Sequence, residues 1–279
     1  EFEPVLPGEI IINELLPDPY AGGSEYIELY NRSEHALSLS ALSLAIRKSD
    51  GTLSTRYPLT SVPHNLKAKG YLLLTKNLEG VTSFYDIADL SALCELSKLP
   101  ILANTSSTLA LLRTADKIVI DEVAYSSKWH AHSVKNVKGV ALERIDPDAA
   151  TQDEANWTSA SETAGCGTPG YQNSQYKNAS SGDATGIEPP VWIEESGSYT
   201  VSYLLDRPGY SCRAFVFNTS GLRVAEISNH ELLGISGKII WSGIANNGSP
   251  LQAGIYIFYA EIYHPEGMVK RFKKAFLIR

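Results

Sequence analysis

The stretch GEIIINELLPDPYAGGSEYIELYN, residues 8–31, decides the fold of this chain. Two runs of apolar and aromatic residues flank a segment with Pro and Gly, which predicts two β-strands joined by a turn. The first predicted strand carries Glu14 and the second carries Glu28. Because a buried carboxylate is costly unless it is paired or ligated, this stretch is either the start of a β-sandwich with an internal polar brace or the edge of a site.

Strand-like runs continue through the first half of the chain. Leucines alternate with other residues over 35–46, and this period of two favours a strand over a helix. YLLLT at 71–75 is typical of a short buried strand, and TLALLRT and KIVIDEVAY, separated by Ala115-Asp116, predict a hairpin. GVALERI at 139–145 supplies a further strand.

The second half repeats this pattern after a polar segment. SQYKNASSGDATGIEPP at 174–190 is rich in Ser, Gly, Asn and Pro, which is typical of an interdomain linker. Six strand-like runs then follow at the spacing of a small sandwich, at 198–205, 212–218, 222–227, 238–241, 254–263 and 268–278. Without any useful amphipathic helix, the chain is predicted to be all-β, with domains at 1–173 and 191–279.

The run GIYIFYAEIY at 254–263 differs from the other predicted strands. Both of its faces are apolar or aromatic, since Tyr256, Phe258 and Ala260 alternate with Ile255, Ile257 and Tyr259. Strands that are buried on both faces carry such continuous apolar runs. We therefore expect this strand in the middle of the second domain.

The charge balance argues against a nucleic-acid partner. The 279 residues carry 31 acidic and 24 basic side chains, a net charge of −7, with −9 in residues 1–190 and +2 in residues 191–279. A nucleic-acid-binding surface usually has a basic stripe, and the first part offers only one cluster, Lys128, Lys135, Lys138 and Arg144. A second cluster, Lys270, Arg271, Lys273 and Lys274, falls on both faces of a strand and predicts a solvated edge.

Cysteine usage and the chain ends leave the compartment open. Cys94, Cys166 and Cys212 fit no metal-finger or redox spacing, and an odd number excludes complete pairing within the chain. A Cys94–Cys166 bridge and three buried thiols are both compatible with the sequence. The first residues, EFEPVLPG, include no initiating methionine, so we expect that a leader was removed or that upstream sequence was cut away. No apolar run approaches the roughly 18 residues of a membrane-spanning helix.

An acidic loop follows the predicted strand at 139–145. Its carboxylates, Asp146, Asp148, Asp153 and Glu154, lie within nine residues and are of the type that calcium prefers as ligands. The spacing is not that of an EF-hand, and Asp-Pro-Asp also starts turns and caps short helices. The loop is therefore either a calcium site or a capped turn, and we expect the following Trp157 to fill the core.

A second local cluster is Trp129-His130-Ala131-His132. Two imidazoles on one side of a strand suit zinc, but only two of the three or four ligands are local. A surface loop, or an exposed tryptophan that stacks on a sugar, explains the same residues. The chain has no Gly-x-Ser-x-Gly elbow and no phosphate-binding glycine motif in a strand-to-helix context, so no nucleophilic or nucleotide chemistry is predicted.

Several motifs of the first half resemble the lamin tail domain family. GEIIINELLPDP, EYIELYNRSEHALSLSALSL, YLLLT, KIVIDEVAY, LERIDPDAATQDEANW and GTPGYQN occur in the order of that domain, over about residues 7–174. The family is an immunoglobulin-like β-sandwich named for nuclear lamins and found in many exported bacterial proteins. The resemblance implies a binding or scaffolding role without catalysis and a periplasmic, surface or secreted location in a Bacteroides-type cell envelope.

The second half resembles a different immunoglobulin-like module. FVFNTSGLRVAEI and IIWSGIANNGSPLQAGIYIFYAEIY are similar to the repeat of flagellar hook-capping proteins and to C-terminal modules of gliding-motility and type IX-secreted proteins. Those modules usually have W-D-G where this chain has Trp241-Ser242-Gly243, and the missing carboxylate weakens the expectation of a cation there. The resemblance implies a spacer, docking or sorting role for this domain.

Three functions are compatible with these patterns. The leading hypothesis is a non-catalytic interaction module outside the cytoplasm, with a protein or glycan partner at the cell surface. The second is the structural C-terminal part of a larger surface protein, and the third is a metal-dependent hydrolase that uses the acidic loop. We expect Glu14 and Glu28 to accept hydrogen bonds from tyrosines, from the backbone or from an arginine such as Arg144. These three residues would then form a polar brace that holds the first strands in register, because a catalytic carboxylate pair normally lines an open cleft. No cofactor is expected other than calcium in the acidic loop.

Overall fold

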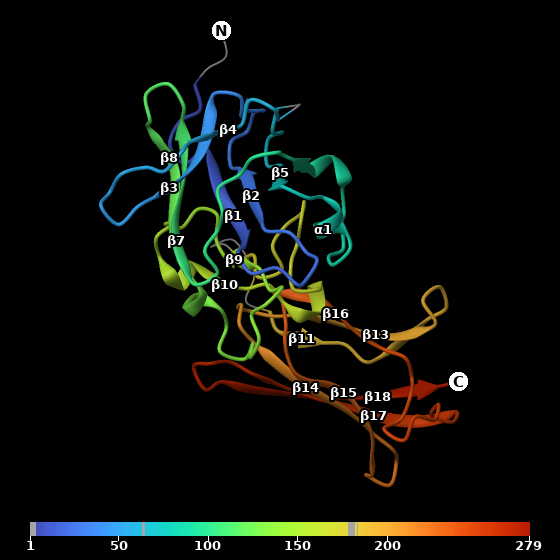
Figure 1. Ribbon diagram of the computed structural model, residues 1–279. Helices are drawn as coiled ribbons and strands as arrows, with labels where there is room; N and C mark the ends of the chain where they lie inside the picture. Colours follow the sequence, from blue (N-terminus) through green and yellow to red (C-terminus); the bar gives the residue numbers. More distant parts are fainter. Residues whose placement is uncertain (1–3, 63–64, 178–181, 183) are drawn as a thin grey trace. The chain divides into compact units, whose positions relative to one another are not determined.

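The computed structural model describes residues 4–62, 65–177, 182 and 184–279 and divides into two compact units (Figure 1). The first unit consists of Glu1–Ala160 and Gly165–Asn178, and the second consists of Ser161–Ala164 and Ala179–Arg279. Strands dominate both units, which confirms the predicted all-β class. None of the helices in the described residues is both long and apolar enough to cross a membrane.

The first unit is a sandwich of two sheets. Its strands are β1 (Ile10–Leu16), β2 (Tyr26–Asn31), β3 (Leu42–Arg47), β4 (Tyr57–Pro58), β5 (Tyr71–Thr75), β6 (Leu93–Glu95), β7 (Ser106–Arg113), β8 (Val119–Ser126), β9 (Leu142–Arg144) and β10 (Trp157–Ser159). Its helices are α1 (Glu79–Thr82) and the 3₁₀ turns η1 (Leu90–Ala92), η2 (Ser127–Trp129) and η3 (Glu154–Asn156).

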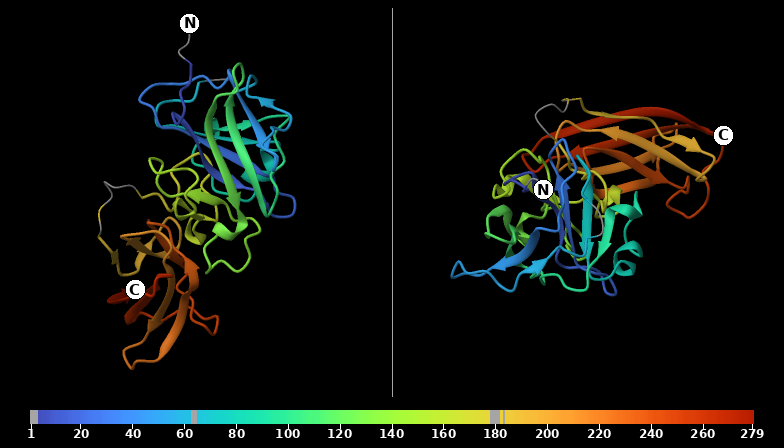
Figure 2. Two further views of the ribbon diagram at one scale, coloured as in Figure 1. Left: turned by 90° about the vertical axis from the view of Figure 1, so that its left-hand side faces the viewer. Right: turned by 90° about the horizontal axis from the view of Figure 1, so that it is seen from above.

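One sheet has the order β10-β9-β1-β2-β5-β6, and the other has the order β4-β3-β7-β8. Figures 1 and 2 show the hairpin of β7 and β8 lying across from β1 and β2. The core between the sheets is made by aliphatic side chains of both, among them Ile10, Ile12, Leu29, Leu44 and Leu109. Burial of such side chains is the main stabilising contribution to a sandwich of this kind.

Strand β1 is the central element of this unit because both of its edges are paired, with β2 and with β9. All seven of its residues are buried. The register shifts between Ile12 and Glu14, where Asn13 is the extra residue of a β-bulge. The predicted pair of strands at 8–31 is therefore confirmed, with a local irregularity that the sequence does not reveal.

Other predicted strands of the first unit are confirmed in part. The hairpin appears as β7 and β8, and YLLLT appears as β5. The predicted strand at 35–46 is wrong over its first half, because a continuous strand begins only at Leu42. The preceding Leu37 forms an isolated bridge with Leu66 and buries its side chain in the core without extending the sheet.

The second unit is also a two-sheet sandwich. It contains the 3₁₀ turn η4 (Glu162–Ala164) and the strands β11 (Gly186–Ile187), β12 (Val191–Ile193), β13 (Ser198–Leu204), β14 (Ser211–Phe217), β15 (Arg223–Leu232), β16 (Ser236–Trp241), β17 (Gly254–Tyr263) and β18 (Val269–Ile278). One sheet has β11, β12 and β16 paired with β13, and the other has the order β15-β14-β17-β18. Val201, Cys212, Val216, Phe258 and Ile262 belong to the buried core between them.

The predicted linker at 174–190 differs from the structure. Residue Gln175 is fully buried in the first unit, and β11 pairs with β13 in the second. Residues 178–181 and 183 of this segment lie outside the described residues. A polar composition therefore does not keep residues 174–177 in solvent, because their main-chain groups are hydrogen-bonded inside the first unit.

Strand β17 confirms one part of its prediction and contradicts another. Both of its edges are paired, with β14 and with β18. Only one face is covered, however: Phe258 and Ile262 are fully buried, whereas Ile255 is 60% exposed and Tyr259 is half-buried. Apolar side chains of this face, such as Ile255, therefore remain partly or largely exposed.

Replacing Leu29 with alanine tests the core of the first unit. Leu29 is fully buried on β2, so we expect Leu29→Ala to lower the free energy of unfolding by about 2–5 kcal/mol, through lost burial and the cavity left behind. Leu90, which is 72% exposed, supplies the control. We expect Leu90→Ala to change the free energy of unfolding by less than about 0.5 kcal/mol. Urea denaturation of both variants measures the difference, and equal effects would contradict the placement of the core.

Candidate functional site

Three buried glutamates lie side by side across three neighbouring strands. Glu14 on β1 is paired in register with Glu28 on β2 and with Glu143 on β9. All three side chains are fully buried. The sequence predicts the inward orientation of Glu14 and Glu28, and the structure adds Glu143. Glu14, Glu28 and Glu143 together form a carboxylate cluster.

The segment 168–175 covers the carboxylate cluster and donates hydrogen bonds to it. Glu14 accepts hydrogen bonds from the hydroxyl of Tyr26, from the main-chain N–H of Thr168 at 3.0 Å and from the Thr168 hydroxyl at 2.7 Å. Glu28 accepts from Gly170 N–H at 2.6 Å and from the side-chain amide of Asn13 at 2.9 Å. The bulge residue Asn13 is thus used to satisfy a buried carboxylate.

Glu143 holds the end of the same segment. It accepts hydrogen bonds from the main-chain N–H groups of Ser174 at 3.1 Å and Gln175 at 2.9 Å, and from the Ser174 hydroxyl at 2.9 Å. With these contacts, every carboxylate oxygen of the cluster accepts at least one hydrogen bond from within the unit. The cluster therefore fixes segment 168–175 on the sheet, and its oxygens are already occupied.

The hydroxyl of Thr168 lies between two carboxyl groups of the cluster. Its Oγ1 atom lies 2.7 Å from Oε2 of Glu14 and 3.0 Å from Oε1 of Glu143. A hydroxyl has only one proton to donate, so the two carboxyl groups share it in a three-centre hydrogen bond or compete for it. Two negative charges this close together are unfavourable, which favours a protonated state for one of the two groups.

The pKa values favour a protonated carboxyl group as well. Burial and, to a lesser extent, the nearby charge of Glu14 raise the pKa of Glu143 to about 8. Burial also raises the pKa of Glu14 and, together with the Glu14 charge, that of Glu28. In the described part of the chain, no lysine or arginine forms an ion pair with these carboxylates, so protons and N–H or O–H dipoles compensate them.

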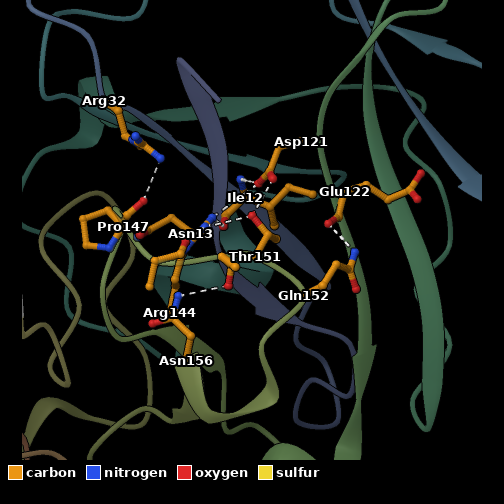
Figure 3. A network of polar contacts seen from close by, with 12 residues as sticks. Ile12, Asn13, Arg32, Asp121, Glu122, Arg144, Pro147, Thr151, Gln152 and Asn156 are labelled. Atoms are coloured by element: carbon orange, nitrogen blue, oxygen red, sulfur yellow. Dashed lines mark hydrogen bonds and ion pairs between the residues drawn. The ribbon is translucent and has the colours of Figure 1, made fainter. Parts of the chain in front are cut away.

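The prediction that Arg144 pairs with Glu14 or Glu28 is wrong. Arg144 follows Glu143 in β9, and successive side chains of a strand point to opposite faces of the sheet. Its guanidinium instead forms an ion pair with Asp121 of β8 at 3.4 Å and donates to the hydroxyl of Thr151 at 2.8 Å (Figure 3). The Arg144 side chain is 1% exposed. Arg144 therefore forms a buried brace with Asp121 and Thr151, and not with Glu14 and Glu28.

This second network joins the two sheets of the first unit. Asp121 accepts hydrogen bonds from the main-chain N–H of Ile12 at 2.8 Å and from the Thr151 hydroxyl at 2.6 Å (Figure 3). Arg144 also donates to the carbonyl groups of Ile12 at 3.4 Å and Ala149 at 2.7 Å. The main chain beside the bulge of β1 is therefore hydrogen-bonded to side chains of β8 and β9.

The four carboxylates of the acidic loop do not form a common ligand set. Asp146 accepts from Asp148 N–H at 2.8 Å, and Asp153 accepts from Ala155 N–H at 3.0 Å as the N-cap of η3. Asp148 lies 3.4 Å from Arg32. In the described residues no group of three or more His, Cys, Asp or Glu side chains is arranged to hold a metal ion, and the contacts of Asp146 and Asp153 are those of capped turns.

The cluster at 129–132 is divided between core and surface. Trp129 packs on Trp157 with ring centroids 6.2 Å apart, and both contribute to the core. The Nδ1 atom of His130 lies 2.8 Å from the hydroxyl of Ser159, and burial lowers the pKa of His130 to about 4. His132 is exposed. The two imidazoles thus lie in different environments, and the Trp129 ring is stacked on Trp157.

Two other expectations are changed by the structure. Arg144 cannot take part in a phosphate-binding patch because it is buried, and Lys138 is paired with Asp18 at 3.0 Å. Lys128, Lys135, Lys138 and Arg144 therefore do not form one basic surface. No disulfide joins Cys94 and Cys166, so that alternative is absent.

Sequence reasoning missed the partners that make the cluster stable. Glu143 lies in a strand of three residues, which is too short to show an alternating pattern. Thr168, Gly170, Ser174 and Gln175 act largely through main-chain N–H groups, which any sequence offers. The register that places Glu143 opposite Glu14 identifies the third glutamate. This register follows from the strand order, which the sequence alone does not give.

The raised pKa of Glu143 predicts a pH-dependent stability. A carboxyl group whose pKa is raised by folding contributes stability that is complete below its ordinary pKa of 4.5 and is lost as the pH rises through about 8. Between pH 5 and pH 9 we expect the free energy of unfolding of the first unit to fall by on the order of 3 kcal/mol. Urea denaturation at the two pH values measures this fall.

The variant Glu143→Gln isolates the group responsible. Glutamine does not ionise, so the free energy of unfolding of this variant should fall much less between pH 5 and pH 9. Amide exchange at Ser174 and Gln175, corrected for intrinsic rates, should show the same smaller change locally. Glu34→Gln changes a side chain that is 86% exposed and serves as the control. An unchanged pH slope in Glu143→Gln would contradict the protonated cluster.

Removing the buried arginine tests the second network. Arg144→Met keeps most of the side-chain volume but leaves Asp121 without its ion-pair partner, so we expect a loss of about 3–5 kcal/mol in the free energy of unfolding. Arg32→Met removes the partly exposed pair with Asp148 and should cost less than about 1 kcal/mol. Thermal and urea unfolding compare the two variants, and equal losses would count against a structural role for Arg144.

Comparison with solved structures finds only distant likeness. Dimeric latent PorU from Porphyromonas gingivalis is 13% identical with a TM-score of 0.27, over 94% of this chain and 19% of that chain. PorZ, a surface component of the type-IX secretion system of the same organism, is 11% identical with a TM-score of 0.26, over 95% and 30%. The exo-chitosanase CsxA from Amycolatopsis orientalis is 12% identical with a TM-score of 0.22, over 89% and 25%.

One segment of the chain matches a family model. The chain spans less than a third of the length of those three solved proteins, and no curated protein matches it. The expected resemblance of the second unit to hook-capping modules stays a prediction. The lamin tail match ends earlier than the motif order over about 7–174 predicts, before β9 and β10. Residues 6–127, which contain β1 to β8, match the family model of the Lamin Tail Domain and have its immunoglobulin-like fold.

Proposed function

We propose that this chain is a non-catalytic interaction module that acts outside the cytoplasm and recognises a protein or a glycan. The observation that carries the proposal is the carboxylate cluster of Glu14, Glu28 and Glu143. Its oxygens accept hydrogen bonds from segment 168–175 and from Tyr26 and Asn13, and its side chains have no exposed surface. A general acid or base must reach its substrate directly or through a water molecule, which this burial prevents.

The rest of the first unit supports the same proposal. The two polar networks hold the strands, the bulge and segment 168–175 in fixed positions, which suits a scaffold that presents loops to a partner. The acidic loop is occupied by turn and cap contacts with its own main chain. The lamin tail match supports a location outside the cytoplasm, because this domain occurs in many exported bacterial proteins.

Binding and turnover assays on the full chain test this proposal together. Immobilised protein is screened on a glycan array and against extracts of cell envelopes, and we expect a ligand that binds reversibly and saturably. Assays with phosphoester and glycoside substrates, with and without Ca²⁺ and Zn²⁺, should give no turnover. Turnover that Glu28→Gln abolishes without unfolding the chain would overturn the proposal, as would the absence of any ligand from both screens.

A further inference from the structure

The uncovered face of β17 forms a groove in the second unit. Tyr259 lies in register between Phe215 of β14 and Lys273 of β18, so its neighbours on the two flanking strands are an aromatic residue and a lysine. The groove has a volume of about 510 Å³ and is lined by Phe217, Ile257, Tyr259, Lys273 and the turn at 218–221. Exposed apolar patches of this kind mark interaction sites in many proteins.

The aromatic rings of this face are held in fixed orientations. Glu261 accepts hydrogen bonds from the hydroxyl groups of Tyr259, at 2.7 Å, and Tyr263. The rings of Phe217 and Tyr259 are nearly perpendicular, at 82°, with centroids 6.3 Å apart. A ligand therefore meets a preformed corner, and binding costs little side-chain entropy.

The charges of this face are unevenly neutralised. Arg271 is paired with Glu261 at 2.8 Å, and Arg223 is paired with Glu226 at 3.6 Å. In the described residues the ammonium group of Lys273 has neither a hydrogen bond nor an ion pair, although Lys273 lines the groove. A cation without a partner beside aromatic rings favours a ligand that combines an apolar surface with a negative charge.

We propose that this groove binds an acidic glycan, in which a sugar ring packs on Tyr259 and Phe217 and its carboxylate pairs with Lys273. The C–H groups of a sugar ring suit the aromatic corner, and a uronic acid supplies the carboxylate. This inference rests on the proposed binding function and names the ligand class and the site.

Two other occupants fit the groove less well. A peptide that adds a strand needs a free edge, but both edges of β17 are paired along the groove. A nucleic acid needs several unpaired cations along a stripe, whereas Arg223 and Arg271 on this face are paired with carboxylates and Arg213 lies over the ring of Phe215. An acidic glycan requires only the ammonium group of Lys273 and the rings.

Calorimetric titration of the full chain with oligogalacturonate at low salt tests the site. The same oligosaccharide with its carboxylates methyl-esterified is the neutral control, and oligoglutamate is the acidic peptide control. We expect binding of oligogalacturonate only. Equal binding of the esterified sugar would overturn the role of charge, and equal binding of oligoglutamate would overturn the assignment to a glycan.

Two variants locate the binding on this face. Lys273→Gln removes the charge and Tyr259→Leu removes the ring while keeping an apolar side chain, and each should weaken binding by about tenfold or more. Lys238→Gln, on β16 in the other sheet, changes an exposed lysine and should leave the affinity unchanged. Circular dichroism confirms that the variants are folded.

The outcomes separate this inference from the proposed function. Binding of oligogalacturonate that both variants leave unchanged would overturn the site while keeping a glycan-binding function. Failure to bind oligogalacturonate, together with a ligand from the glycan array or envelope extracts, would overturn the acidic ligand and keep the proposed function. Loss of binding in Lys273→Gln and Tyr259→Leu, but not in Lys238→Gln, supports the proposal.

Discussion

The structure of the first unit depends on the donation of main-chain N–H groups to three buried carboxylates. Glu14, Glu28 and Glu143 lie on adjacent strands, and no cation pairs with them among the described residues. Segment 168–175 supplies the required donors although it is about 150 residues from Glu14 in sequence. The lamin tail match ends at residue 127, and Glu14 and Glu28 lie inside it. The unit therefore needs segment 168–175, well beyond the match, to provide hydrogen bonds to these two carboxylates.

Much of the strand content follows from the sequence, whereas the site follows only from strand order. Alternation and turn residues predict the hairpin of β7 and β8 and the inward orientation of Glu14 and Glu28. Glu143 and Arg144 are neighbours in a strand, so the period of two allows only one of them to face the cluster. Choosing Glu143 requires knowing that β9 pairs with β1, a contact between distant segments.

Two failures of prediction share one physical origin. Residues 174–177 have the composition of a linker, yet the main-chain N–H groups of Ser174 and Gln175 are hydrogen-bonded to a buried carboxylate. Strand β17 has the composition of a strand buried on both faces, yet Ile255 and Tyr259 lie on an uncovered face. Composition reports which side chains are apolar, but burial depends on which other segment covers them.

Glutamate side chains have different roles in the two units because their surroundings differ. Hydrogen bonds from Tyr263 and Tyr259, with Arg271 beside them, lower the pKa of Glu261 to about 2, so this residue stays charged and orients aromatic rings at a surface. Glu143 also accepts several hydrogen bonds, but complete burial without a cation raises its pKa to about 8. Burial and the absence of an arginine thus outweigh the number of donors. A charged carboxylate can organise a binding face that water reaches, whereas a carboxylate cluster sealed from water is suited to holding main chain in place.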